Sequence, residues 1–126
     1  MNNSILVIED NEQNLYLVTF LLEQSGFNIF AARSGPEGIE TAGRIEPDLI
    51  LLDIQLPIMD GYAVAHELRQ NPDLQNVPIV AVTSYAMVGD KEHALQAGCT
   101  GYIEKPINPA TFVAEIERYL PGSKKT

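Results

Sequence analysis

The sequence predicts an α/β fold, a doubly wound parallel sheet of five strands with helices on both faces. Three segments, residues 5–8, 49–52 and 79–82, are apolar at every position, which is typical of strands buried on both faces. Helical patterns alternate with these strands and with two weaker ones, and such alternation calls for a parallel sheet covered on each side. Polar residues follow the apolar strands, which indicates a site at one edge of the sheet.

Composition predicts one domain. The chain has 126 residues, of which 45% are apolar and 20% charged, and its net charge is −9. We expect a single domain over residues 1–126, with a core at about 4–120 and a polar tail at 121–126. The acidic balance argues against nucleic acid and anionic membrane as direct partners. One cysteine, Cys99, excludes an internal disulfide, and no segment has the pattern of a signal peptide or membrane span, so we expect a cytoplasmic protein.

The strands are predicted from apolar runs between turn residues. They are residues 5–8, 27–32, 49–52, 79–82 and 101–103. The second alternates only weakly in polarity, and the fifth is short. Five strands in one small domain favour the order 2-1-3-4-5 of flavodoxin-like (βα)5 folds, in which the first and third strands are neighbours.

The first two helices are predicted from their ends. A helix from about Asn11 repeats apolar residues at helical spacing, and Gly26 fits the left-handed position that follows a helix. Ser34 is suited to cap the second helix, and Pro36 is tolerated in its first turn. The second helix is expected to run to about Ile45.

The last three helices follow from similar signals. Asp60 is predicted to cap a helix that runs to about Gln70. The helix at about 88–97 has few apolar anchors, so we expect it to be mobile. Asn108 is predicted to cap the last helix, with Pro109 at its first position. Its expected buried stripe is Phe112, Ile116 and Leu120.

The strand ends bring several reactive groups to one edge. Glu9 and Asp10 follow the first strand, Asp53 ends the third, Thr83 follows the fourth and Lys105 follows the fifth. Any one of these side chains alone would be explained as a helix cap or a solvated group. Their joint arrival at the carboxyl edge of one sheet instead predicts a functional site.

Clustered carboxylates restrict the chemistry of this site. Like charges about 4 Å apart cost about 1 to 4 kcal/mol, so the cluster favours a retained proton or a divalent cation. Oxygen ligands suit Mg²⁺, with Mn²⁺ as a substitute. Asp53 then fits a carboxylate nucleophile for a phosphoryl group, while Lys105, the Thr83 hydroxyl and the Ser84 N–H fit its oxygens.

These residues resemble the response regulator receiver domain over about residues 4–120. The matching segments are Val7–Asn11, Asp53–Gly61, Val82–Ser84 and Tyr102–Pro106. The resemblance implies a part in two-component or phosphorelay signalling, with Asp53 accepting phosphate from a phosphohistidine on a sensor histidine kinase or a phosphotransfer protein. It also implies that phosphorylation switches a protein–protein interaction surface.

The resemblance also assigns roles to single residues. Mg²⁺ ligands would be Asp10, Asp53 and the main-chain carbonyl of Gln55, with Glu9 acting through water. Thr83 and Lys105 would contact the phosphoryl group, and Tyr102 would be the aromatic switch residue that moves when the Thr83 hydroxyl is drawn inward. The Lys105–Pro106 peptide is commonly cis in this family.

Some positions depart from the common family pattern or vary within it. Ser84 stands where Ala or Gly is more frequent, and Gln55 and Tyr85 occupy positions that tune dephosphorylation in the family. The lifetime of the aspartyl phosphate therefore stays open. So do the cognate kinase and the downstream protein target. We expect a homodimer that forms on phosphorylation through the fourth and fifth helices.

Three alternatives remain. A phosphatase of the haloacid-dehalogenase type would carry a second acid two residues after its nucleophile, where this chain has Gln55. A flavodoxin-type module would carry a phosphate-binding loop in place of Glu9 and Asp10. A receiver-shaped scaffold that is never phosphorylated would not need the full set of acids, hydroxyl and lysine. We expect no enzyme beyond self-phosphorylation and autodephosphorylation.

Other residues are predicted to lie at the surface. His66 and His93 fall on helices among polar neighbours, so neither is expected to be a phosphorelay histidine. Tyr16 and Phe20 exceed what one buried helix face requires, which predicts exposed aromatics available to a partner helix.

Overall fold

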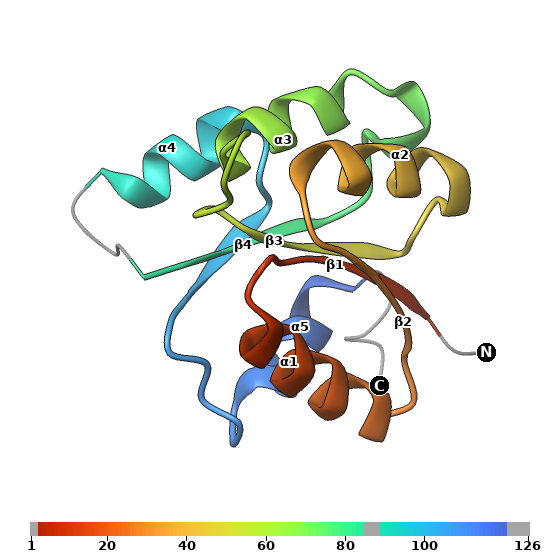
Figure 1. Ribbon diagram of the computed structural model, residues 1–126, viewed down its shortest axis with the longest axis vertical. Helices are drawn as coiled ribbons and strands as arrows, with labels where there is room; N and C mark the ends of the chain where they lie inside the picture. The colour runs from red at the N-terminus through yellow and green to blue at the C-terminus, as the bar shows by residue number, and fades with distance from the viewer. Residues whose placement is uncertain (1–2, 85–88, 121–126) are drawn as a thin grey trace.

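The computed structural model describes residues 3–84 and 89–120, which form a central sheet with a layer of helices on each face (Figure 1). The strands are β1 Ser4–Ile8, β2 Asn28–Ala32, β3 Leu49–Asp53, β4 Ile79–Thr83 and β5 Gly101–Glu104. The helices are α1 Glu12–Gln24, α2 Gly35–Ile45, α3 Gly61–Arg69, α4 Asp90–Ala97 and α5 Phe112–Tyr119, with a short 3₁₀ helix, η1, at Pro72–Leu74.

The sheet confirms the predicted fold class. Its order is β2-β1-β3-β4-β5, and every neighbouring pair is parallel. In Figure 1, α1 and α5 cover one face while α2, α3 and α4 cover the other. All strands therefore run the same way, and their carboxyl ends meet at one edge.

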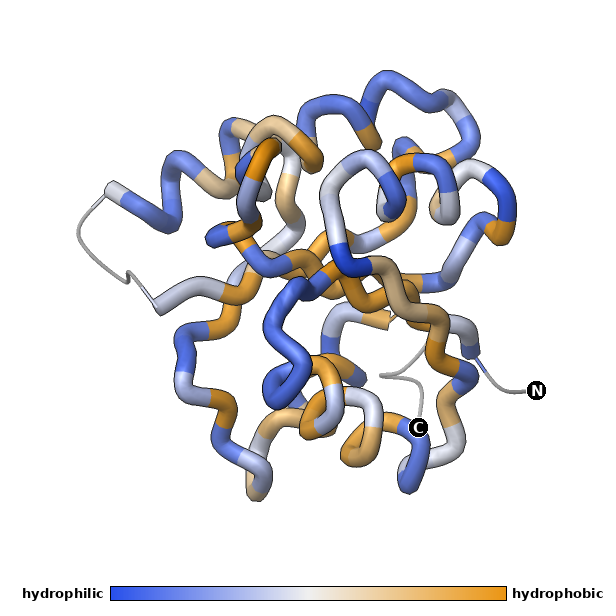
Figure 2. Tube along the Cα trace, viewed as in Figure 1, coloured by the Kyte–Doolittle hydropathy of each residue, from blue (hydrophilic) through white to orange (hydrophobic). Residues whose placement is uncertain are grey.

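The core lies in two layers because successive strand residues point to opposite faces. Ile50 and Leu52 of β3 pack toward α2, α3 and α4, whereas Leu49 and Leu51 pack toward α1 and α5. Every residue of β3 and β4 is buried. Figure 2 shows this as a hydrophobic band through the centre of the molecule, with polar residues toward the outside. The buried strands thus fix the positions of the residues that follow their carboxyl ends.

The predicted caps of α2 and α3, Ser34 and Asp60, are confirmed, and Asn11 caps α1 in the same way. The side chains of Asn11, Ser34 and Asp60 each accept a hydrogen bond from the N–H three residues later. Gly26 has a φ of +96°, the left-handed conformation expected after α1. The buried stripe of α1 is Leu15, Val18 and Leu22.

The start of the last helix corrects a prediction. Asn108 accepts a side-chain hydrogen bond from the Ala110 N–H at 3.0 Å, but the regular helix begins only at Phe112, after Thr111. The side chain of Asn108 therefore closes a turn ahead of α5, and the Asn108 carbonyl accepts from the Phe112 N–H at 2.9 Å. The expected stripe of Phe112, Ile116 and Leu120 is buried, as predicted.

Two further predictions concern residues at the limits of the described chain. The fourth helix begins at Asp90 within the described residues, whereas Val88, its predicted start, lies outside them. The predicted tail at 121–126 also lies outside them. Among the residues described, no helix combines the length and apolarity that crossing a bilayer requires.

Candidate functional site

The register of the strands aligns the ends that carry the predicted site residues. Ile8 of β1 lies opposite Leu52 of β3, which brings the next residues, Glu9 and Asp53, beside each other. Asp53 lies opposite Val82, so Thr83 ends β4 one residue beyond it. Thr83 in turn lies opposite Glu104, and Lys105 follows. The predicted residues are therefore brought together by the backbone itself.

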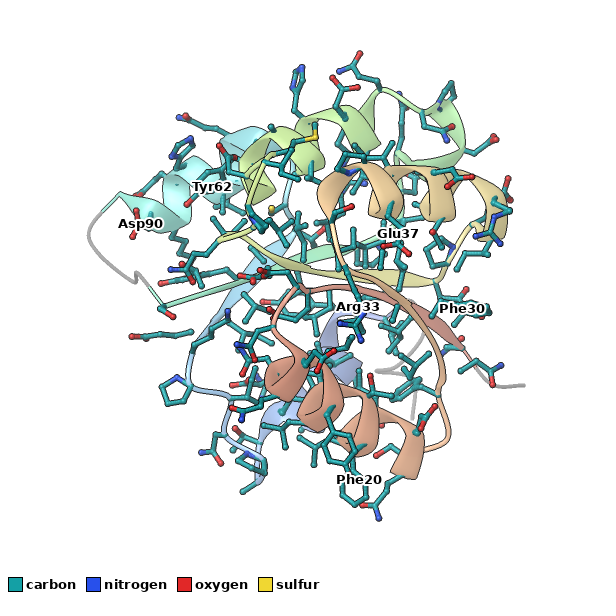
Figure 3. All side chains as sticks on the ribbon, in the orientation of Figure 1. Phe20, Phe30, Arg33, Glu37, Tyr62 and Asp90 are labelled. Carbon is teal, nitrogen blue, oxygen red and sulfur yellow. The ribbon has the colours of Figure 1, made fainter. Side chains whose placement is uncertain are left out.

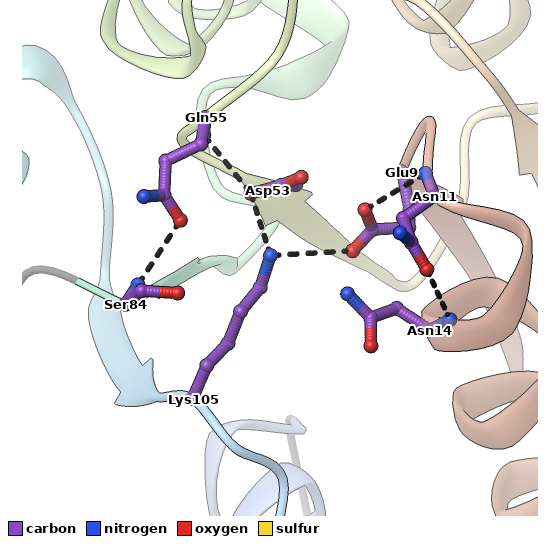
Figure 4. Close-up of polar contacts among 7 residues, drawn as sticks. All are labelled: Glu9, Asn11, Asn14, Asp53, Gln55, Ser84 and Lys105. Atoms are coloured by element: carbon purple, nitrogen blue, oxygen red, sulfur yellow. Dashed lines mark hydrogen bonds and ion pairs between the residues drawn. The ribbon is translucent and has the colours of Figure 1, made fainter.

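Lys105 lies between two of the acids (Figure 4). Its Nζ is 3.2 Å from Asp53 Oδ1 and 3.8 Å from Glu9 Oε1. Asp53 and Glu9 are only 2% and 4% exposed. Charges interact more strongly where water is largely excluded, so the Lys105 ammonium is held close to the buried Asp53 carboxylate and beside Glu9.

Asp10 completes an acidic cluster. Glu9, Asp10 and Asp53 each offer a carboxylate oxygen, and these atoms all lie within 4.8 Å of one another. Asp10 is exposed, whereas the other two acids are buried, so the cluster opens to solvent on one side. Three hard oxygen donors at this spacing fit a divalent cation such as Mg²⁺ that keeps part of its water shell.

The raised pKa of Glu9 shows that a negative charge is unfavourable at this buried position. Burial is the largest cause that raises the pKa of Glu9 from 4.5 to about 8, and a hydrogen bond with Asp53 and the charge of Asp53 add to it. The Asn11 N–H, which donates to Glu9 Oε2 at 3.2 Å, and the charge of Lys105 oppose this rise. The charge of Lys105 therefore does not return the pKa of Glu9 to its ordinary value. Glu9 retains a proton near neutral pH when no cation is bound.

The loop after β3 is fixed around Asp53. The Gln55 N–H donates to Asp53 Oδ1 at 2.9 Å, and the Gly61 N–H donates to the Ile54 carbonyl at 2.9 Å. A Cβ at position 61 would lie 2.7 Å from the Asp53 carbonyl oxygen, so only glycine permits this close approach. The motif that followed Asp53 in the sequence thus folds back tightly against the strand end.

One hydrogen-bond donor of the site has a partner in the structure that was not predicted from the sequence. The Ser84 N–H, predicted to serve a phosphoryl oxygen, donates to Gln55 Oε1 at 3.1 Å. These residues lie 29 positions apart, and no local sequence signal links them.

The predicted switch residues occupy neighbouring strands. Thr83 is buried, and Tyr102 on β5 is half-buried against the core layer of α2, α3 and α4. The Lys105–Pro106 peptide is cis, as the resemblance implied. Tyr85 lies outside the described residues.

The remaining side chains singled out in the sequence lie away from the acids. His66 is exposed, as predicted. His93 is also exposed, as predicted, and its ring stacks on Tyr62 with centroids 3.8 Å apart, a contact that was not predicted. Tyr16 and Phe20 are 73% and 46% exposed and stack on each other, which confirms them as surface aromatics; Phe20 is labelled on α1 in Figure 3.

Comparison with known proteins gives consistent matches along the chain. The family model described as the response regulator receiver domain matches residues 5–117. The polar-differentiation response regulator DivK of Brucella ovis is 43% identical over 120 residues, which cover 95% of this chain and 98% of DivK. The same regulator of Brucella anthropi is 42% identical over 120 residues, with the same coverage.

Solved structures agree with these relatives. The receiver domain of the sensor histidine kinase PA1611 from Pseudomonas aeruginosa, described with a magnesium ion in its active-site cleft, has a TM-score of 0.87 at 34% identity, covering 94% of this chain and 98% of that one. The chemotaxis protein CheY4 of Vibrio cholerae has a TM-score of 0.91 at 25% identity, covering 95% and 100%. The fold, the acidic cluster and these relatives together show that this chain belongs to the response regulator receiver domain family of two-component signalling.

Proposed function

We propose that Asp53 is the phosphoacceptor of this receiver domain and that a phosphohistidine on a sensor histidine kinase or a phosphotransfer protein is the donor. A carboxylate oxygen of Asp53 forms a bond to phosphorus while the bond from phosphorus to the imidazole nitrogen breaks. The nitrogen leaves with the bonding electron pair, and the product is an aspartyl phosphate. The observation that carries this proposal is the contact of Lys105 Nζ with both Asp53 and Glu9 beside a three-carboxylate cluster.

A divalent cation is the second part of the proposal. Asp10, Asp53 and the main-chain carbonyl of Gln55 would hold Mg²⁺, or Mn²⁺ in its place, with Glu9 acting through water. The bound cation would neutralise charge on the acids and on the incoming phosphoryl oxygens. The oxygen spacing within 4.8 Å supports this assignment.

The other site residues would hold and sense the phosphoryl group. Lys105 already contacts Asp53 Oδ1 and would shift its ammonium toward a phosphoryl oxygen. The Thr83 hydroxyl would donate to another oxygen, and Tyr102 on the neighbouring strand would move into the space that Thr83 leaves. This change would alter the interaction surface for a downstream protein, and it would promote pairing of two copies through α4 and α5.

We expect no turnover of a separate substrate at this site. A phosphatase built on this layout would need an acid two residues after Asp53, and Gln55 instead uses its side chain to accept from the Ser84 N–H. The activity we infer is limited to phosphorylation of Asp53 and loss of that phosphate.

The test is incubation with acetyl phosphate and Mg²⁺ followed by intact-mass spectrometry. We expect one added phosphoryl group on the wild-type chain and none on Asp53→Asn or in the presence of a chelator. Asp73→Asn is the matched control, because Asp73 is an exposed acid of η1 and precedes β4 at the opposite edge of the sheet. A folded wild-type chain that gains no phosphoryl group, or equal gain by Asp53→Asn, contradicts the proposal, and repeated turnover of a small phosphoester would favour the phosphatase.

A further inference from the structure

Gln55 makes two hydrogen bonds that join the ends of two strands (Figure 4). Its main-chain N–H donates to Asp53 Oδ1 at 2.9 Å, at the end of β3. Its side-chain Oε1 accepts from the Ser84 N–H at 3.1 Å, one residue beyond the end of β4. Gln55 therefore links the two strand ends, with its main-chain N–H on Asp53 and its carboxamide oxygen on Ser84.

The Ser84 N–H is a donor that the proposed phosphoryl group needs. It follows Thr83, whose strand lies directly beside that of Asp53, with Asp53 opposite Val82 in the register. A phosphoryl group on Asp53 adds oxygens that accept hydrogen bonds from N–H and O–H donors at this edge of the sheet. The carboxamide oxygen of Gln55 occupies one of those donors in the unphosphorylated protein.

We infer that the Gln55 carboxamide acts as an internal stand-in for a phosphoryl oxygen, which phosphorylation has to displace from the Ser84 N–H. This inference rests on the proposed function and adds a positioning residue to it. Before phosphorylation, the bond holds the end of β4 against the loop after β3. After phosphorylation, a charged phosphoryl oxygen takes the donor and the carboxamide turns away.

The exchange is favourable because the two acceptors differ in charge. A phosphoryl oxygen carries negative charge and accepts a stronger hydrogen bond than a neutral amide oxygen. Gln55 is half-buried and Ser84 is exposed, so water can solvate the carboxamide once it is released. Losing one neutral hydrogen bond of this kind should change a binding constant by about 2- to 10-fold.

The test compares the affinity of Gln55 variants for beryllofluoride, a tetrahedral anion that mimics the phosphoryl group on aspartate. Gln55→Met keeps the length of the side chain and removes its acceptor oxygen. At saturating Mg²⁺, we expect Gln55→Met to bind beryllofluoride about 2- to 10-fold more tightly than wild type in an NMR titration. Without beryllofluoride, the Ser84 amide hydrogen of this variant should exchange with solvent faster than in wild type.

A control and a third variant complete the design. Gln75→Met changes an exposed glutamine that follows η1 and precedes β4, at the opposite edge of the sheet, and should leave both readouts unchanged. Gln55→Glu keeps an acceptor but adds charge facing the anion, so it should bind beryllofluoride more weakly than wild type. Melting curves of all variants verify that each is folded.

The outcomes separate this inference from the proposed function. If wild-type protein with Mg²⁺ does not bind beryllofluoride, the proposed function itself fails. If wild type binds but Gln55→Met binds equally or more weakly, the displacement model is overturned, since the carboxamide then either does not compete or assists the anion. Unchanged exchange of the Ser84 amide in folded Gln55→Met overturns it as well.

Discussion

Among single residues, Glu9 shows most clearly how the buried site lowers the stability of the folded protein. Glu9 is 4% exposed, and burial together with the neighbouring Asp53 raises the pKa of its carboxyl to about 8. In the metal-free protein this carboxyl therefore keeps its proton near neutral pH, and ionising it lowers the free energy of unfolding. A divalent cation would favour the ionised form of Glu9, which links folding stability to ligand binding.

The pH dependence of stability tests this link. The carboxyl of Glu9 loses its proton near pH 4.5 in the unfolded chain but keeps it to about pH 8 in the folded one. Because the folded state binds more protons between these values, metal-free stability should fall as pH rises from 4.5 to 8. Glu9→Gln should flatten this slope and raise stability at pH 7.5 by on the order of 1 to 4 kcal/mol.

The measurement is urea unfolding in a chelator across this pH range. Glu40→Gln, an exposed acid on α2, serves as the control and should keep the wild-type slope. Added Mg²⁺ should stabilise wild type more than Glu9→Gln. Identical slopes for wild type and Glu9→Gln would show that the buried carboxyl is not the source of the pH dependence.

Among the elements, α2 shows how closely the helix layer sits on the sheet. A Cβ on Gly38 would come 2.4 Å from Ile8 Cδ1 of β1, whereas a Cβ on Gly43 would meet only Asn71 Nδ2 at 3.6 Å. Both glycines lie in the same helix, one facing the core and one facing solvent. Gly38 thus permits α2 to approach the strand that ends at Glu9.

Two alanine substitutions in α2 should act in opposite directions. Gly43→Ala should stabilise the protein by about 0.5 to 1 kcal/mol, because alanine loses less backbone entropy in a helix. Gly38→Ala should destabilise it by about 1 to 3 kcal/mol, since the added methyl overpacks the interface. Chemical denaturation of both variants provides the measurement, and stabilisation of both would contradict the close packing of α2 on β1.

The elements also show how far the sequence could predict the structure. Apolar runs and caps such as Ser34 and Asp60 are local signals, and they predicted the strands, the sheet class and the starts of three helices. The predicted start of α5 was wrong because Asn108 is equally suited to close a turn that precedes a helix, and only packing decides between the two. Local chemistry therefore predicts elements better than it predicts their limits.

Side-chain pairing across the site was predicted less completely. The strand ends predicted that Asp53 and Lys105 would meet, although 52 positions separate them. The bond from Ser84 to Gln55 was not predicted, because it depends on the rotamer of one side chain after two separate strands have paired. The stacking of His93 on Tyr62 was missed for the same reason, since it depends on how α4 lies against α3.

At the scale of the whole molecule, Arg69 joins segments at the edge of the sheet away from the acids. Its guanidinium donates to the carbonyl oxygens of Gly98 at 2.9 Å, Leu74 at 2.7 Å and Val77 at 2.8 Å. These carbonyls belong to the connections between α3 and β4 and between α4 and β5. Arg69 thereby anchors one end of α4 while the site lies at the other edge of the sheet.

Removing this anchor should weaken the fold but spare the chemistry. Arg69→Met should lower stability by about 2 to 4 kcal/mol, because it leaves partly buried carbonyls without a charged donor. Arg44→Met, an exposed arginine on α2, is the control and should change stability little. Below its melting temperature, Arg69→Met should still accept a phosphoryl group from acetyl phosphate, and loss of that reaction in the folded variant would contradict the separation of the two edges.

The whole fold converges on one acid, because five parallel strands place Asp53 at the centre of their common edge with Glu9, Asp10, Thr83 and Lys105 around it. Site mapping of the phosphoryl group tests this most directly. The chain is phosphorylated with acetyl phosphate and Mg²⁺, reduced with borohydride, which converts an aspartyl phosphate to homoserine, and digested for tandem mass spectrometry. The account predicts homoserine at position 53 and at no other acid; homoserine at Asp10 or elsewhere, or none in a folded chain, would contradict it.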